Sequence, residues 1–236
     1  MAILKRLAAP RWWKIPRKLG KFVVSPRPGP HPKEECVPLA VLIRDYLKLA
    51  ENLKEAKRII KSGFVKVNGK VRNDHKFPVG LMDVVELGEK GKEGYLALRV
   101  IPSKGGFDFK QISDPERRLM RLDNKHFVRG GKVQLNFHDG ENMLVDKEEA
   151  KKFSTGDVLL VETYGKKILK HLKLEPGAKA FVIKGENRGR IGEVIRIEKT
   201  RSMLGTLVVV KLEEKEIRVP KDFVFVVGRE RPEVEV

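Results

Sequence analysis

Four cationic side chains, Lys54, Lys57, Arg58 and Lys61, recur at the spacing that places residues on one face of a helix. Like charges at this spacing repel each other by a few tenths of a kcal/mol per pair, so a folded helix gains nothing from them alone. A polyanion would gain, because the same side chains neutralise its phosphates. The spacing therefore predicts a phosphate-binding face, and a solvated basic face without a ligand is the alternative.

A β-hairpin is predicted directly after this face, with Asn68 and Gly69 at its tip. A three-residue loop that ends in a left-handed Gly69 would pair Lys66 with Lys70 and keep the valines together on the other face. A two-residue loop would place Val67 opposite Lys70 and mix the two faces. We therefore predict the three-residue loop, with a basic face on the hairpin.

Two helices are expected to position these residues. The first, over residues 39–47, has apolar residues at i, i+3, i+4, i+7 and i+8, which form one buried stripe. The second, over residues 53–62, starts at Asn52, which can cap it together with Glu55, and ends at a left-handed Gly63. The elements predicted next are a turn at residues 78–80 and a strand at residues 83–87.

The first 33 residues hold half of the net charge of +18, with nine Lys or Arg and no acid. Six prolines exclude a long helix, and a segment of this composition is expected to be disordered alone and to order against a partner. Trp12 and Trp13 lie between Arg11 and Lys14, so the indoles are predicted to stack on bases or ribose while the cations meet phosphates. The alternative is that the tryptophans dock on the protein's own core.

The C-terminal region is predicted to be a small SH3-like barrel, because short strand-like runs alternate with tight turns. Within it, Lys184, Asn187, Arg188 and Arg190 lie among four glycines, which would let the backbone turn tightly and approach RNA. The stretch lacks the Gly-Lys-Ser or Gly-Lys-Thr of a nucleotide-binding loop, so that function is excluded. The predicted strands cover residues 179–184, 190–199, 206–212, 216–220 and 223–227.

Residues 95–172 are predicted to form a mostly β domain, and their sequence indicates fold more than function. A short helix over residues 114–122 would expose Arg117, Arg118 and Arg121. The other predicted elements are strands at 95–101 and 157–162, a turn-containing connection at 103–110, a hairpin around Asp139 and Gly140, and a joining segment at 167–174.

Residue types argue against several other kinds of chemistry. Cys36 is the only cysteine, so an intramolecular disulfide and a cysteine metal cage are excluded, and a reducing cytosol is the natural compartment. The five histidines are widely separated, so we predict neither a zinc site nor a cofactor. The apolar runs are too short to span a bilayer, and we expect neither a membrane partner nor a signal peptide.

The order of the motifs resembles that of known RNA-binding families. The run IIKSGFVKVNGKVRND followed by FPVGLMDVVEL is similar to the S-four (S4) type RNA-binding domain, and PGAKAFVIKGENRGRIGEVIRIE resembles a KOW motif. From RWWKIPRKLGKFVVSPRPGPHP through NRGRIGEV to FVFVVG, the chain resembles the archaeal and eukaryotic "e-type" S4 family of small-subunit ribosomal proteins. The resemblance implies small-subunit ribosomal RNA and neighbouring ribosomal proteins as partners, a place in the cytoplasmic ribosome, and no enzymatic activity.

Two alternative functions use the same modules. One is an RNA-modifying enzyme, whose catalytic domain could only occupy residues 89–176, and the other is a transcription-elongation-type regulator that uses the KOW barrel. We predict an α+β, multidomain protein with a basic extension (1–36), a helix-helix-hairpin RNA-binding domain (37–94), a mostly β domain (95–172) and a KOW barrel with C-terminal tail (173–236). The residues predicted to bind RNA are Arg11, Trp12, Trp13, Lys14, Arg17, Lys18, Lys54, Lys57, Arg58, Lys61, Lys66, Asn68, Lys70, Arg72, Lys184, Asn187, Arg188 and Arg190.

Overall fold

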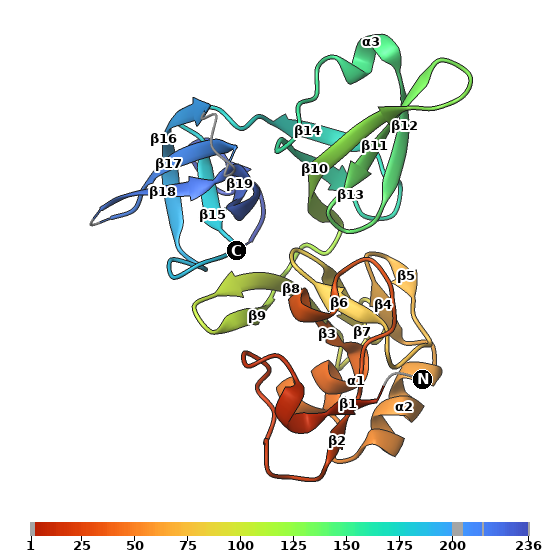
Figure 1. Ribbon diagram of the computed structural model, residues 1–236. Helices are drawn as coiled ribbons and strands as arrows, with labels where there is room; N and C mark the ends of the chain where they lie inside the picture. Colours follow the sequence, from red (N-terminus) through yellow and green to blue (C-terminus); the bar gives the residue numbers. More distant parts are fainter. Residues whose placement is uncertain (1–2, 200–204, 214, 236) are drawn as a thin grey trace. The chain divides into compact units, whose positions relative to one another are not determined.

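The computed structural model describes residues 3–199, 205–213 and 215–235. The chain forms two compact units, residues 1–100 with 105–115 and residues 101–104 with 116–236. The first unit contains the red to yellow-green elements of Figure 1, and the second contains the green to blue ones. The described residues are mostly β with few helices, so the α+β assignment is correct in part.

A five-stranded sheet with the order β5-β4-β7-β8-β9 is the framework of the first unit. The strand predicted at residues 83–87 is confirmed as β7, and β8 pairs with it in an antiparallel register that begins at Val84 opposite Arg99. Because β8 and β9 extend this sheet, the predicted boundary between residues 94 and 95 falls inside it. The strands are β4 (Val65–Val67), β5 (Lys70–Val71), β7 (Val84–Leu87), β8 (Leu96–Ser103) and β9 (Gly106–Gln111).

Both predicted helices are present, although the first is not a regular α-helix. It consists of α1 (Leu39–Val41) followed by a π-helical turn (Leu42–Tyr46), in which the Leu47 amide donates to the Leu42 carbonyl at 3.0 Å. The first part of the predicted apolar stripe is fully buried, and the stripe becomes half-exposed from Tyr46 onward. The second helix, α2 (Leu53–Lys61), has the predicted position.

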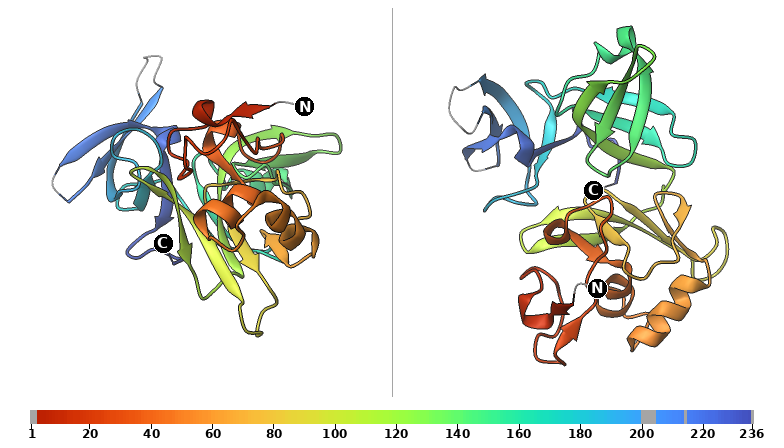
Figure 2. Two further views of the ribbon diagram at one scale, coloured as in Figure 1. Left: turned by 90° about the horizontal axis from the view of Figure 1, so that it is seen from below. Right: turned by 45° about the vertical axis from the view of Figure 1, so that its right-hand side comes forward.

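The N-terminal segment folds on the first unit, which corrects the expectation that it is disordered alone. Its strand β1 (Leu4–Lys5) pairs with β2 (Phe22–Val23), and the segment lies beside α1 and β3 in the views of Figures 1 and 2. Gly106 at the start of β9 shows how closely it packs: its φ is +134°, and a Cβ there would lie 2.5 Å from the Trp12 Cβ. Apolar and aromatic side chains in the segment therefore find partners within this protein.

The turn predicted at residues 78–80 is wrong, because these residues form a strand. This strand, β6 (Pro78–Gly80), pairs antiparallel with β3 (Cys36–Pro38), and all three of its residues are buried. The chain turns just afterwards at Met82, whose φ of 61° is left-handed. Cys36 on β3 is fully buried, and this burial is the main cause that raises the pKa of its thiol to about 12.

A second five-stranded sheet, in the order β12-β11-β10-β13-β14, begins the second unit. The hairpin around Asp139 and Gly140 is confirmed as β11 and β12, and the strand at 157–162 as β13. The joining segment at 167–174 is instead mostly a strand, β14. The elements are β10 (Arg117–Phe127), β11 (Lys132–Phe137), β12 (Asn142–Asp146), α3 (Lys147–Ala150), β13 (Val158–Glu162) and β14 (Ile168–Leu172).

The helix predicted over residues 114–122 is wrong, because this stretch enters the long central strand β10. Leu119 and Met120 are adjacent in sequence, yet each is 1% exposed, since both faces of β10 are covered there. Arg118 is not exposed as predicted: its guanidinium is buried and donates to Asp139 Oδ2 at 2.5 Å. The helix was predicted because Arg118 was assigned to an exposed polar face, whereas its charge is buried beside Asp139.

The five strands predicted near the C-terminus are confirmed to within two residues at each end, and they form one sheet with the order β18-β17-β16-β15-β19. Consecutive pairs from β15 to β18 are antiparallel, and β19 returns to pair with β15. The closure of this sheet into an SH3-like barrel stays a prediction. The strands are β15 (Lys179–Val182), β16 (Ile191–Lys199), β17 (Thr206–Lys211), β18 (Glu216–Pro220) and β19 (Val224–Gly228).

Candidate nucleic-acid interface

The start of α2 is capped nearly as predicted. The Asn52 Oδ1 accepts the Glu55 amide at 3.0 Å. The Glu55 carboxylate accepts the amide of Glu51 at 2.9 Å and the side-chain amide of Asn52 at 2.6 Å. The bond from the Glu51 backbone is the main cause that lowers the pKa of Glu55. At the other end Gly63 is left-handed, with φ +84°, so both helix signals are confirmed.

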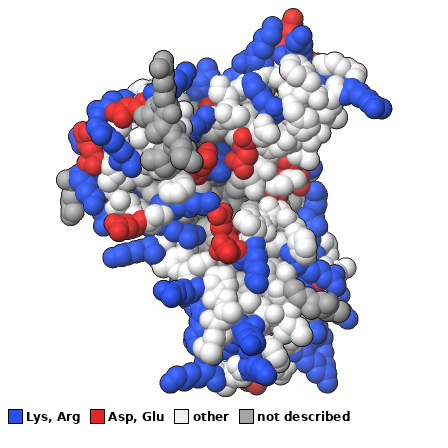
Figure 3. Space-filling view, viewed as in Figure 1, with Lys and Arg blue, Asp and Glu red and all other residues white. Residues whose placement is uncertain are grey.

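The predicted cations of α2 lie on its solvent side. Ala56 and Ile60 on the opposite side are fully buried, so the rotation of the helix is fixed. Three of the four cations are exposed and Lys57 is half-buried, and none of the four forms an ion pair with another described residue. On the face drawn in Figure 3, Lys and Arg side chains line the edges of the first unit and few acidic side chains interrupt them. This surface is therefore available to an anion.

The hairpin after α2 has a two-residue loop, so the predicted three-residue loop is wrong. Val67 lies opposite Lys70, and both loop residues are left-handed, with φ 52° for Asn68 and 74° for Gly69. Positive φ at both positions is the requirement of the type I′ turn that matches the twist of a hairpin. Placing an apolar residue opposite a lysine costs the hairpin little stability here, because both residues of the edge strand β5 are exposed. Lys70 accordingly points to solvent.

Asn68 serves the fold of the hairpin as well as its turn. Its Oδ1 accepts the Val84 amide at 2.9 Å and its Nδ2 donates to Asp83 Oδ1 at 2.7 Å. The other Asp83 oxygen contacts His31 Nε2 at 2.8 Å and accepts the Gly80 amide at 2.9 Å. Both polar groups of the Asn68 side chain are therefore already used, which makes Asn68 a positioning residue for the hairpin tip.

The buried Asp83 links the N-terminal segment to this hairpin. Its side chain is 1% exposed and that of His31 is 4% exposed. Burial alone would raise the pKa of Asp83, but the His31 charge and the hydrogen bonds from His31, Gly80 and Asn68 together hold it below its usual value. Fifty-two residues separate His31 from Asp83, so no short-range signal in the sequence could have paired them.

The tryptophans follow the alternative interpretation and dock on this protein. Trp13 is 2% exposed and its Nε1 donates to the Cys36 carbonyl at 3.0 Å, which corrects the expectation that its ring stacks on RNA. Trp12 is half-buried, donates to the Glu34 carbonyl at 3.0 Å, and meets the Phe107 ring edge-on at 5.0 Å between centroids. Two adjacent indoles thus anchor the segment to β3 and β9.

Four of the predicted basic residues near the tryptophans differ in what they contact. Arg17 is half-buried and donates to three backbone carbonyls of its own segment at 2.6–3.0 Å, so it holds the segment together. Lys14 is exposed but forms an ion pair with Asp108 on β9 at 2.5 Å. Arg11 and Lys18 are exposed. Within this group, Arg11 and Lys18 are the residues best placed to meet a phosphate.

The two remaining hairpin residues are partly covered. Lys66 is half-buried on β4. Arg72 is half-buried and its guanidinium lies 4.3 Å from the centre of the Phe77 ring. Exposed Lys5, on β1, and Lys21, directly before β2, were not predicted as binding residues. Their signal was present in the sequence, since they belong to the acid-free first 33 residues.

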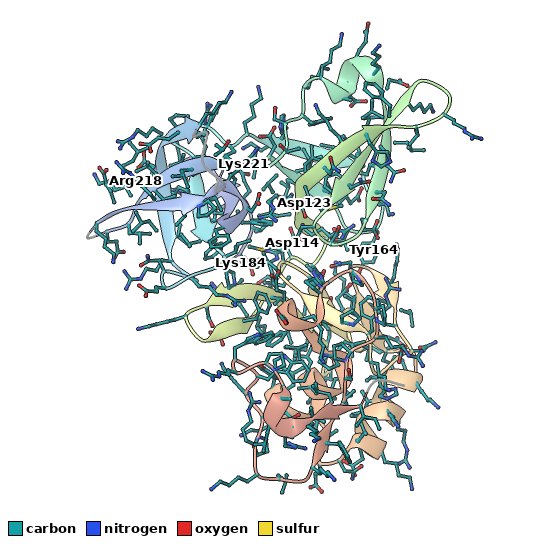
Figure 4. The ribbon with its side chains drawn as sticks, in the orientation of Figure 1. Asp114, Asp123, Tyr164, Lys184, Arg218 and Lys221 are labelled. Carbon is teal, nitrogen blue, oxygen red and sulfur yellow. The ribbon has the colours of Figure 1, made fainter. Side chains whose placement is uncertain are left out.

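The predicted RNA-binding loop of the second unit lies between β15 and β16. Arg190 is exposed, whereas Asn187 and Arg188 are half-buried. Figure 4 labels Lys184 and Lys221, which line one hollow together with Arg121, Asp123 and Asp222, so cations and acids share it. Burial is the main cause that lowers the pKa of Lys221.

One of the loop glycines allows a close backbone approach within this protein, where an approach to RNA was predicted. Gly189 is left-handed, with φ +84°, and a Cβ there would lie 2.7 Å from the Ser103 Cα. The close backbone approach that requires glycine is therefore made to a segment of the same unit. The sequence alone could not distinguish this approach from one to RNA, because both require the absence of a Cβ.

Within residues 3–199, 205–213 and 215–235, no group of three or more His, Cys, Asp or Glu side chains is arranged to hold a metal ion. None of the helices in the same ranges combines the length and apolarity needed to cross a membrane.

The helix α2, its hairpin and the sheet behind them define an RNA-binding protein built on an S4 domain. The family model described as S4 domain matches residues 37–85, and the RS4NT (NUC023) domain matches residues 3–34. The model described as ribosomal family S4e matches residues 96–168. The three models match consecutive stretches of the chain between residues 3 and 168.

Full-length relatives give the particular family. A protein named small ribosomal subunit protein eS4 from Archaeoglobus fulgidus is 44% identical over 225 residues, which cover 95% of this chain and 92% of the relative. The protein of the same name from Methanocaldococcus jannaschii is 40% identical over 97% of this chain and 95% of its own. The crystal structure of the 30S ribosomal protein S4e from Thermoplasma acidophilum matches with a TM-score of 0.70 and 32% identity, over 84% of this chain and 97% of that one. The chain belongs to the ribosomal protein family S4e.

Proposed function

We propose that this chain is a structural protein of the small ribosomal subunit in the cytoplasm and that it binds ribosomal RNA mainly through α2 and the adjoining hairpin. One observation carries this proposal: the four cations of α2 lie together on its solvent side, where three of them are exposed and Lys57 is half-buried. A monomer gains no stability from such a face. Ribosomal RNA supplies the missing negative charge, and the relatives' names place them in the small subunit.

Further contacts surround this surface. Lys70 at the hairpin tip and the exposed Arg11 and Lys18 of the N-terminal segment extend it within the first unit. In the second unit, the exposed Arg190 would meet RNA from the loop between β15 and β16. We assign residues 173–236 to a KOW-type SH3-like barrel, supported by the five strands and this loop. Neighbouring ribosomal proteins are the other partners.

Binding rests on neutralising phosphates at fixed positions. Each Lys or Arg that meets a phosphate releases condensed counterions, so affinity falls as salt rises. The N-cap, the left-handed Gly63 and the Asn68 bonds fix the helix and hairpin, so little ordering is left to occur on binding. The proposed role includes no catalysis and no cofactor. The comparisons give no support to the RNA-modifying enzyme or the elongation-type regulator.

The test combines sedimentation with a charge reversal. The unaltered protein is expected to co-sediment with small ribosomal subunits at moderate salt. Lys57→Glu combined with Lys61→Glu should weaken binding of the free chain to small-subunit ribosomal RNA by at least tenfold, since each charge-assisted contact is worth about 1.5–3 kcal/mol. Its thermal stability should not fall, because both side chains lie on the solvent side of α2.

A matched control has the same change of net charge elsewhere. Lys167→Glu combined with Lys173→Glu alters two exposed lysines that lie outside the proposed surface. This variant should lose much less affinity than the α2 variant. Equal affinity of both variants for the RNA would reject α2 as the binding face, and failure of the unaltered chain to co-sediment would reject the proposed function.

A further inference from the structure

A large aromatic side chain is exposed at the far end of β10. Phe127 is 70% exposed, although its cross-strand partner Val133 and the next residue across, Val145, are 4% and 8% exposed. Cross-strand partners lie on the same face of a sheet, so Phe127 continues the core face of this sheet beyond the core itself. The hairpin loop that follows carries Arg129 and two left-handed glycines.

Phe127 borders a hollow of about 180 Å³ between the β10–β11 hairpin and α3. The apolar part of its lining is Phe127, Val133 and Ala150, and the polar part is Lys125, His126, Lys147 and Lys151. No carboxylate lines it, although Glu148 and Glu149 also belong to α3. The hollow therefore joins one aromatic face to an entirely basic rim.

Two of the lysines, Lys147 and Lys125, have defined positions in the hollow. Lys147 Nζ lies 5.9 Å from the centre of the Phe127 ring. Lys125 Nζ donates to the carbonyls of Ala150 and Phe153 at 3.2 and 2.8 Å, so it is tied to the wall of the hollow. Lys151 is exposed at the rim. The aromatic ring and the cations thus line the same hollow and are not scattered over the surface.

We propose that this hollow binds a single unstacked base of ribosomal RNA, with the base stacked on Phe127 and the flanking phosphates met by Lys147 and Lys151. Aromatic rings bordered by cations are the recurrent means of holding unpaired nucleotides, because every base has a π face and every linkage a negative charge. An acidic peptide would satisfy the lysines but has no need of a largely exposed aromatic ring. The inference rests on the proposed function and extends it to the second unit.

Single exposed apolar residues are common, so exposure alone does not mark a site. Leu144 on β12 provides the comparison. It is 60% exposed, but it pairs with Gln134 and so lies on the opposite face of the same sheet from Phe127. It does not belong to the lining of the basic hollow. Leu144 is therefore the matched control for removing exposed apolar surface.

The first test measures affinity of the full-length chain for small-subunit ribosomal RNA. Phe127→Ala should weaken binding about five- to hundredfold, the loss that removal of one stacked base produces. Phe127→Trp should preserve binding, and Leu144→Ala should leave it unchanged. Thermal unfolding of all variants should match that of the unaltered chain, since both side chains are mostly exposed. Unchanged affinity of Phe127→Ala would overturn the proposal.

The second test identifies the occupant. Ultraviolet crosslinking of assembled small subunits, followed by digestion and mass spectrometry, should find a nucleotide attached to the peptide that contains Phe127. A crosslink from this peptide to a neighbouring protein instead would overturn the proposal in favour of a protein partner. The Lys57→Glu and Lys61→Glu variant separates the two levels of inference: if it loses RNA affinity while Phe127→Ala does not, the proposed function stands and this site falls.

Discussion

The N-terminal segment and α2 are both basic, yet the protein uses their cations and aromatic residues in opposite ways. In the N-terminal segment, Trp13 is buried and Arg17 donates to three backbone carbonyls. In α2, the core side is made by Ala56 and Ile60, and the cations remain on the solvent side. A high density of positive charge in two stretches therefore does not mean an equal share in binding.

The difference follows from what each stretch can bury. The helix α2 has its own apolar residues at helical spacing, so its cations are not needed for folding. The N-terminal segment has little regular structure, and many of its backbone groups need partners from side chains. Arg17, with its five donors, supplies several such bonds at once. We therefore expect substitutions in the segment to lower stability and substitutions in α2 to lower RNA affinity.

The largest effect on stability is expected for Trp13→Ala. It removes a buried indole and its bond to the Cys36 carbonyl, and should lower the free energy of unfolding by about 3–5 kcal/mol. Denaturant unfolding of the full chain measures this loss. Trp12→Ala is the matched control and should lose less, because its ring is only half-buried. A Trp13→Ala chain of normal stability but weak RNA binding would reverse our assignment of this residue.

The next largest effect is expected for Asp83→Asn, which should lower the free energy of unfolding by about 1.5–3 kcal/mol at neutral pH. The folded pKa of Asp83 lies below the ordinary 3.8, so its charge stabilises the fold above that pH, and this contribution is lost as the pH falls through the lowered value. The difference in stability between the unaltered chain and the variant should therefore shrink as the pH is lowered below about 4.

The measurement is unfolding of both proteins at a series of pH values. All other carboxyl groups titrate in both chains, so their effects cancel in the difference. A difference that stays constant down to the lowest pH at which both chains fold would show that the charge of Asp83 does not stabilise the link between His31 and the hairpin.

A smaller effect should separate two neighbouring cations. Arg17→Ala loses three hydrogen bonds to backbone carbonyls and should lower the free energy of unfolding by about 1.5 kcal/mol. Lys18→Ala changes an exposed side chain and should leave stability unchanged while weakening RNA binding. Calorimetry on the two variants measures the change in stability, and an RNA titration measures the change in affinity. Equal stability of the two variants would remove the distinction between a structural and a binding cation in this segment.

Local signals in the sequence predicted much of the fold. Asn52 and Gly63 fixed the limits of α2 because a cap and a left-handed stop act within a few residues. The five C-terminal strands were found because turns and alternating apolar residues are equally local. The prediction for the loop at Asn68 is wrong because the backbone twist, which favours a two-residue turn, decides the loop length here, and the separation of the two faces does not.

Long-range partners explain the other differences. Arg118 was expected on the surface because no short-range pattern reveals that Asp139 would meet it in the core. The partners of His31 and Trp13 are also distant in the sequence: His31 contacts the Asp83 carboxylate, and Trp13 donates to the buried Cys36 carbonyl. The residue types that bind RNA and those that satisfy buried polar groups are the same, so the sequence located the basic stretches but could not divide their members between the two uses.

The most direct test of the account is the salt dependence of binding to small-subunit ribosomal RNA by the unaltered chain and by Lys57→Gln combined with Lys61→Gln. Each phosphate contact contributes about 0.7–0.9 to the slope of log affinity against log salt concentration, so the double variant should have a slope shallower by about 1.5. Identical slopes, with both proteins folded to the same degree, would contradict the claim that the solvent side of α2 binds RNA.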